Sequence, residues 1–188
     1  MAEITALTDL VDKPFQLLQE LDRRSRQAAA GRQMDSGLET ADEWVGVGIR
    51  MGDHNILVER DEVREVLPMP SVARVPGAQS WLKGLANVRG QLLSVVDLSE
   101  LAGKGSTLID RASRVVAVRH AEIPAGLLVN EVRGFRRFQP DEAVDELPDF
   151  DGPIKELFRG GFRRGDEYWA VLRLRDLVES QMFLQAAQ

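Results

Sequence analysis

Short runs of apolar, β-branched and aromatic residues recur from residue 44 onward, each separated from the next by a turn-forming segment. In the first run, Trp44–Ile49, glycine alternates with larger residues, and the turn Met51–His54 joins it to a second run, Ile56–Val58. Alternation with a period of two predicts strands, and two strands around a short turn predict a hairpin. The same pattern predicts strands at 62–67, 85–88, 92–98, 115–118, 127–129, 132–138, 158–162 and 168–172. Many short strands at short intervals indicate small β-barrels rather than β-α-β units.

Helical spacing occurs at the two ends of the chain. Pro14 suits the first turn of a helix that is predicted to reach Arg26, with an apolar stripe of Phe15, Leu18 and Leu21. Whether this stripe packs on its own domain or on a partner stays open. A second helix is predicted at the C-terminus from Leu174, Leu177, Val178, Met182 and Phe183. We therefore expect a helical N-terminal extension and linker at 1–43 and a β domain at 44–188.

Composition narrows the functional classes. The chain has 188 residues, of which 44% are hydrophobic, enough for a real core. Its formal net charge of -6 disfavours nucleic-acid and anionic-membrane binding, because the summed field repels polyanions. The absence of cysteine excludes disulfides, thiolate zinc sites and cysteine nucleophiles. No apolar stretch approaches the ~18–20 residues needed to span a bilayer, so we expect a cytoplasmic protein without direct membrane insertion.

Fragments that resemble chemical motifs fail on inspection. In Gly103–Thr107 the lysine precedes the second glycine, whereas a phosphate-binding loop needs it afterwards. A calcium loop around Asp149–Gly152 has leucine and phenylalanine at its first and last ligand positions. His54 and His120 stand apart from other metal-binding or catalytic residues. The sequence therefore predicts no enzyme, no metal site and no cofactor.

One group of residues supports an alternative function. Six arginines flank three phenylalanines in the C-terminal half: Arg133, Arg136, Arg137, Arg159, Arg163 and Arg164 with Phe135, Phe138 and Phe162. Basic residues interleaved with aromatics on a small barrel can bind single-stranded nucleic acid. The competing interpretation places the phenylalanines in the core and the arginines against water or acidic loops. The acidic charge balance favours that second interpretation.

The segment Trp81–Leu98 carries a specific pattern. It reads G-x-x-N-V-R-G followed by an apolar strand that ends in D-L, and the matching residues are Gly84, Asn87, Arg89, Gly90, Asp97 and Leu98. Two weaker stretches, Glu62–Val66 and Gly126–Val132, accompany it in the same order. On these residues the chain from about Trp44 to the C-terminus resembles the CheW-like family. One departure is Asn130, where the family usually has aspartate.

The resemblance implies a mainly β fold of two small SH3-like β-barrels packed together, here with N-terminal and C-terminal helices. It also implies a non-catalytic adaptor in chemotaxis-like signal transduction. Such an adaptor binds the cytoplasmic tip of a methyl-accepting chemoreceptor and the regulatory domain of a CheA-type histidine kinase. It is recruited to membrane-associated receptor arrays. The N-terminal extension resembles that of the coupling proteins of type IV pilus twitching-motility systems.

The matched family positions imply a receptor-binding site at Val63, Glu65, Val66 and Arg89. Val63 and Glu65 are two apart in a predicted strand, so they should share a face, and Val66 should point the other way unless the strand bends. Arg89 is followed by Gly90, which permits a tight turn. The guanidinium of Arg89 either contacts a partner or forms an internal ion pair, and the two roles are compatible.

Overall fold

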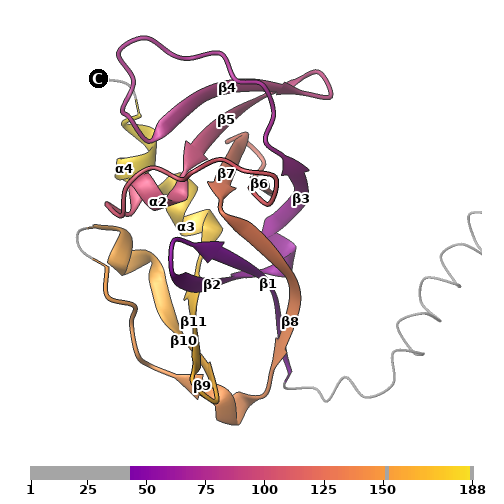
Figure 1. Ribbon diagram of the computed structural model, residues 1–188, viewed down its shortest axis with the longest axis vertical. Helices are drawn as coiled ribbons and strands as arrows, with labels where there is room; N and C mark the ends of the chain where they lie inside the picture. Colours follow the sequence, from indigo (N-terminus) through magenta and orange to yellow (C-terminus); the bar gives the residue numbers. More distant parts are fainter. Residues whose placement is uncertain (1–42, 151–152, 187–188) are drawn as a thin grey trace, which may run out of the picture. The chain divides into compact units, whose positions relative to one another are not determined.

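The computed structural model describes residues 43–150 and 153–186 (Figure 1), so the helix predicted from Pro14 to Arg26 lies outside the described residues. The strands in the described part are β1 (Trp44–Met51), β2 (His54–Glu59), β3 (Val63–Pro68), β4 (Leu82–Val88), β5 (Gln91–Asp97), β6 (Arg114–Val118), β7 (Ala125–Val129), β8 (Glu131–Phe138), β9 (Ala143–Val144), β10 (Phe158–Arg164) and β11 (Glu167–Leu172). The helices are short: η2 (Arg60–Glu62), α2 (Leu98–Leu101), η3 (Pro140–Glu142), η4 (Pro153–Leu157), α3 (Leu174–Glu179) and α4 (Gln181–Leu184).

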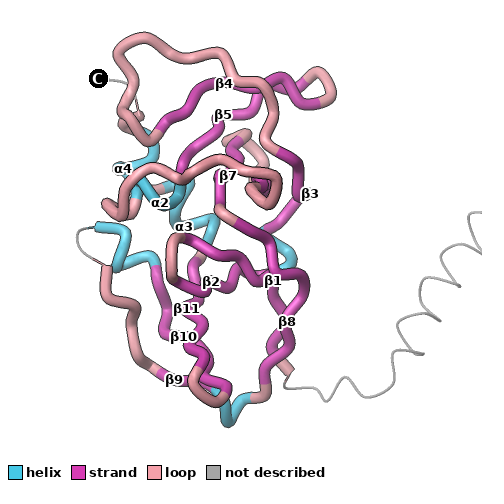
Figure 2. Tube along the Cα trace, viewed as in Figure 1, coloured by secondary structure: helices cyan, strands magenta, loops and turns pink. Residues whose placement is uncertain are grey.

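The strands form two sheets, which Figure 2 shows as two groups joined by loops and short helices. The six-stranded sheet has the order β8-β1-β2-β11-β10-β9, and the five-stranded sheet has the order β3-β6-β7-β5-β4. Neighbouring strands are antiparallel except for β2 with β11 and β5 with β7, which are parallel. The expected mainly β fold of two small barrels packed together is confirmed.

Apolar side chains from both sheets share one core. Its buried residues include Ile49 and Ile56 from the six-stranded sheet, Val116 and Leu127 from the five-stranded sheet, and Leu177 from α3. Each barrel also has a smaller cluster of its own, around Leu93 in one and around Trp169 in the other. Burying apolar surface drives folding in proportion to the area removed from water, so the shared core fixes one sheet against the other.

Three local predictions were wrong. The strand predicted at 85–88 begins earlier, because β4 starts at Leu82. A Cβ at Gly84 would lie 2.3 Å from the carbonyl oxygen of Ala73, so only glycine lets the two backbones pair here. Leu98 starts α2 rather than ending a strand. The single C-terminal helix is divided at Ser180, whose hydroxyl accepts a hydrogen bond from the Phe183 N–H and begins α4.

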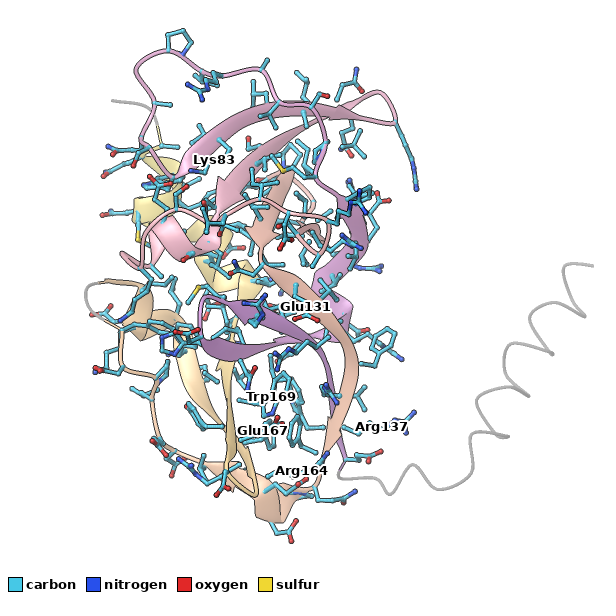
Figure 3. The ribbon with its side chains drawn as sticks, in the orientation of Figure 1. Lys83, Glu131, Arg137, Arg164, Glu167 and Trp169 are labelled. Atoms are coloured by element: carbon cyan, nitrogen blue, oxygen red, sulfur yellow. The ribbon has the colours of Figure 1, made fainter. Side chains whose placement is uncertain are left out.

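The carboxylate of Asp97 is the main polar anchor of the five-stranded barrel. Asp97 is fully buried, and it accepts hydrogen bonds from the backbone N–H groups of Ser99, Glu100 and Thr107 at 3.1, 3.3 and 2.8 Å. It also accepts from the Thr107 hydroxyl and lies 3.3 Å from Lys83 Nζ, the residue labelled at the top of Figure 3. Asp97 therefore starts α2 and holds the loop that follows it.

We predict that Asp97→Ala lowers the free energy of unfolding by about 3 kcal/mol or more, because it leaves several buried donors without an acceptor. The matched control is Asp110→Ala, since Asp110 accepts hydrogen bonds from the backbone N–H groups of Ala112 and Ser113 at the surface. The control should cost at most about 1 kcal/mol. Chemical denaturation measures the free energy of unfolding of both variants. Equal losses in the two variants would show that the buried hydrogen bonds of Asp97 contribute no more to stability than the surface hydrogen bonds of Asp110.

Candidate functional site

A groove of about 510 Å³ opens between strand β3 of one sheet and strand β8 of the other. Both are edge strands of their sheets, and both lie on the same side of the molecule in Figure 1. Its apolar lining includes Val47, Val63 and Val132, and charged side chains stand around it. The full lining is Val47, Arg60, Asp61, Val63, Arg64, Glu65, Val66, Arg119, Val132, Gly134 and Phe135. Apolar pockets with a few placed polar groups are the usual form of a binding site.

Three of the four residues expected at the receptor site line this groove. A β-bulge in β3 determines how they are oriented, because the register moves from Val63 opposite Val118 to Glu65 opposite Ala117. Val66 then lies opposite Val116. Directly opposed residues share a face, and Val116 and Val118 belong to the same core cluster. The bulge therefore returns Val66 to the face of Val63 and leaves Glu65 on the other face, so the expected pairing of Val63 with Glu65 was wrong.

Val63 and Val66 differ in how far they are buried. Val63 is 9% exposed and belongs to the shared core, whereas Val66 is 40% exposed. Val66 is thus free to contact a partner, while Val63 forms the floor beneath it. A substitution at Val63 removes core contacts as well as groove surface.

Arg89, the fourth expected residue, lies at the tip of the β4–β5 hairpin. Val88 and Gln91 are paired, so Arg89 and Gly90 form a two-residue loop with φ angles of 53° and 83°. Positive φ at both positions is typical of a type I′ turn, whose twist matches that of the strands. The Gly90 N–H donates to Asn87 Oδ1 at 2.9 Å and fixes the turn. The Arg89 side chain therefore starts from a rigid support.

The Arg89 guanidinium lies 3.1 Å from Glu65 Oε2, and the Arg89 side chain is still 79% exposed. The internal ion pair and the accessible surface position thus occur together. Beside this pair, Arg64 Nη1 donates to Gln91 Oε1 at 2.7 Å. These two contacts join β3 to the β4–β5 hairpin, so the charged edge of the groove is held in place from both sides.

The sequence did not assign a role at the site to Phe135, which lines the groove, or to Glu62, which lies next to it in the chain and supports β3. Phe135 on β8 is 67% exposed and forms the wall opposite Val66. The carboxylate of Glu62 accepts from the backbone N–H groups of Leu174 and Arg175 at 2.8 and 3.2 Å. It thereby fixes the start of β3 to the first turn of α3, where a negative charge also suits the helix dipole. No local sequence signal links Glu62 to a segment over a hundred residues away.

The arginine–phenylalanine group does not form a basic nucleic-acid surface. Phe138 and Phe162 are 1% and 8% exposed and stack with a centroid distance of 4.8 Å, inside the six-stranded barrel with Trp44 and Trp169. Phe135 is the exception, as described above. Five of the six arginines form salt bridges with carboxylates: Arg133 with Glu131, Arg137 with Glu43, Arg159 with Asp176, Arg163 with Glu146 and Arg164 with Glu142. Figure 3 shows Arg137 and Arg164 near the end of this barrel. Charges neutralised in this way are poorly placed to bind phosphates.

The remaining candidate residues have structural roles. His54 packs against Phe150 with a centroid distance of 4.6 Å, and burial lowers its pKa. His120 Nδ1 accepts from the backbone N–H of Ile123 at 3.1 Å. Asn130 Oδ1 accepts from the Gly52 N–H at 2.7 Å, so the amide supports the β1–β2 turn in place of a carboxylate. Within residues 43–150 and 153–186, no three metal-binding side chains are grouped closely enough to hold an ion.

The Glu142–Arg164 pair predicts a pH dependence. Hydrogen bonding to Arg164, with a further hydrogen bond from the Gln139 N–H, lowers the pKa of Glu142 from 4.5 to about 2. A carboxyl whose pKa is lower in the folded state stabilises the fold above its unfolded pKa, and this contribution is lost as the pH falls through the folded value. We expect the wild type to lose stability between pH 4.5 and 2 more steeply than Glu142→Gln. Thermal unfolding across this range measures the difference, and parallel curves would contradict the assignment.

Comparison with known proteins agrees with this architecture. The family model for the CheW-like domain matches residues 45–182. A solved structure of the scaffolding protein TtCheW from Thermoanaerobacter tengcongensis has the same fold, with a TM-score of 0.64 over 74% of this chain and 94% of that chain, at 20% sequence identity. The family match covers well over half of the chain and includes both sheets. The chain is a member of the CheW-like family.

Among curated relatives, protein PilI of Pseudomonas aeruginosa is 37% identical over 177 residues, which cover 94% of this chain and 98% of PilI. The chemotaxis protein CheW of Helicobacter pylori is 21% identical over 162 residues, 86% of this chain and 96% of that protein. Protein FrzA of Myxococcus xanthus is 31% identical over 99 residues, 53% of this chain and 60% of FrzA. No helix in the described part of the chain is long and apolar enough to cross a membrane.

Proposed function

We propose that this chain is a non-catalytic adaptor that couples a methyl-accepting chemoreceptor to a CheA-type histidine kinase. Membership of the CheW-like family and the similarity to PilI and CheW along most of the chain support a coupling role in chemotaxis-like signalling. The similarity to PilI, which extends over 94% of the chain, points further to the control of type IV pilus motility. In this role the chain acts in the cytoplasm and is recruited to membrane-associated receptor arrays.

The observation that carries this proposal is the groove between β3 and β8. Receptor tips of the type that the resemblance implies are helical hairpins, and an amphipathic helix docks with its apolar face in a groove. Val66 and Phe135 provide exposed apolar walls, and Arg89 with Glu65 provides a charged edge. The groove lies over the shared core, so no loop has to become ordered before a helix binds. Binding therefore avoids that entropy cost.

The kinase partner follows from the family resemblance rather than from a particular surface. We propose that the regulatory domain of the kinase binds outside the groove, because one groove cannot hold receptor and kinase together. We propose that the receptor site is formed by the four expected residues, Val63, Glu65, Val66 and Arg89. We propose that residues 1–43 form a helical N-terminal extension and linker, outside the CheW-like domain at 44–188.

We predict that Arg89→Ala weakens binding of a purified receptor-tip fragment at least tenfold while the thermal midpoint changes by less than about 2 °C. The reason is that Arg89 is 79% exposed, so truncation removes a partner contact and little internal packing. Titration calorimetry with the receptor fragment measures the affinity. Arg159→Ala is the matched control, since Arg159 is an exposed arginine paired with Asp176 away from the groove lining. Equal binding by wild type and Arg89→Ala would remove Arg89 from the site.

The two valines should behave differently from each other. Val66→Ser is expected to reduce receptor binding with little loss of stability, because Val66 is 40% exposed. Val63→Ala is expected to reduce both, with about 1–3 kcal/mol lost from the free energy of unfolding, because it opens a cavity in the shared core. Chemical denaturation and the same titration separate the two effects. If Val66→Ser bound the receptor fragment as well as the wild type, Val66 would not be a contact residue.

A further inference from the structure

The net charge of the groove is opposite in sign to the net charge of the whole chain. The groove lining contains three arginines, Arg60, Arg64 and Arg119, and two carboxylates, Asp61 and Glu65. Arg89 adds a fourth arginine at 3.1 Å from Glu65. The whole chain carries a formal net charge of -6, so the groove is a basic region on an acidic protein. Clustered charge of one sign creates a local potential that selects partners of the opposite sign.

Arg119 and Arg60 are available to pair with carboxylates of a partner, because neither is held in a strong internal ion pair. Arg119 is exposed, and within the described residues it has no carboxylate partner, since its guanidinium donates only to the carbonyl oxygen of Val63 at 3.3 Å. Arg60 lies 3.5 Å from Asp61, but their side chains are 62% and 89% exposed, so water screens this pair. Arg64 and Arg89, by contrast, are held by Glu65 and Gln91.

Arg60 and Arg119 stand at the same end of the groove. The Arg119 N–H donates to the carbonyl oxygen of Glu62, which is the last residue of the η2 turn that begins with Arg60. The turn itself is fixed, because the Glu62 carboxylate is hydrogen-bonded to the first turn of α3. Both guanidinium groups therefore extend from anchored backbone next to the apolar lining, where a docked helix would present its polar flank.

We propose that Arg60 and Arg119 determine which partner the groove accepts, and that the partner is a helical segment with carboxylate side chains along one flank of its apolar stripe. This inference rests on the proposed function, since the occupant is a receptor tip, and it adds the charge pattern that the tip must carry. A tip with neutral or basic residues at these positions would leave the two arginines unpaired and would bind more weakly.

The test is a charge exchange measured with the full-length chain and a purified receptor-tip fragment. Arg119→Glu and Arg60→Glu are each expected to weaken binding at least tenfold at low salt, and the loss should shrink as salt screens the groove. Replacing single acidic residues of the fragment by lysine should identify one that restores binding to Arg119→Glu while weakening binding to the wild type. Such reciprocal rescue arises from a direct charge contact and not from a general loss of stability.

Arg111→Glu is the matched control, because Arg111 is an exposed arginine that does not line the groove. It should bind the fragment within about twofold of the wild type. If Arg60→Glu and Arg119→Glu also bind like the wild type, or if no acidic residue of the fragment gives rescue, the charge selection is wrong while the adaptor function stands. If the wild-type chain itself does not bind the fragment, the proposed function fails and the inference fails with it.

Discussion

The shared apolar core between the two sheets is the constraint on which the rest of the structure depends. It receives fully buried side chains from both barrels and from α3, so neither sheet completes its packing alone. The groove lies at the rim of this core, where Val47 and Val63 belong to both the core and the groove lining. The position of β3 relative to β8, and hence the shape of the groove, is therefore set by core packing rather than by loops.

Polar groups reinforce the same arrangement. Asp97 anchors α2 and the following loop inside one barrel, and Glu62 fixes the start of β3 to α3 across the junction of the sheets. At the far end of the six-stranded barrel, carboxylates neutralise most of the exposed arginines. In the groove, Arg119 has no carboxylate partner among the described residues, and the Arg60–Asp61 pair is exposed to water. This charge distribution leaves positive charge at the groove for binding an acidic partner.

Periodicity alone predicted most of the strands, because alternating valine and glycine or valine and leucine runs have few other stable arrangements. The arrangement of the site could not be predicted in the same way. The bulge at Arg64 reverses the faces of the residues after it, and the bulge is visible only in the pairing of β3 with β6. Phe135 was grouped with Phe138 and Phe162 in the sequence, yet it is exposed where they are buried. Contacts such as Glu62 with Leu174 depend on the folded chain and leave no local pattern.

Site-directed cross-linking can show whether the receptor tip lies in the groove, and the chain is well suited to it because it contains no cysteine. Single substitutions Val66→Cys and Phe135→Cys place a thiol on each wall of the groove. Leu108→Cys provides a control at a side chain that is 86% exposed and lies outside the groove lining. With cysteines introduced along the receptor tip, disulfides are expected to form with both groove positions and not with position 108. Cross-links that form at Leu108→Cys and are absent from both groove variants would contradict binding of the receptor tip in the groove.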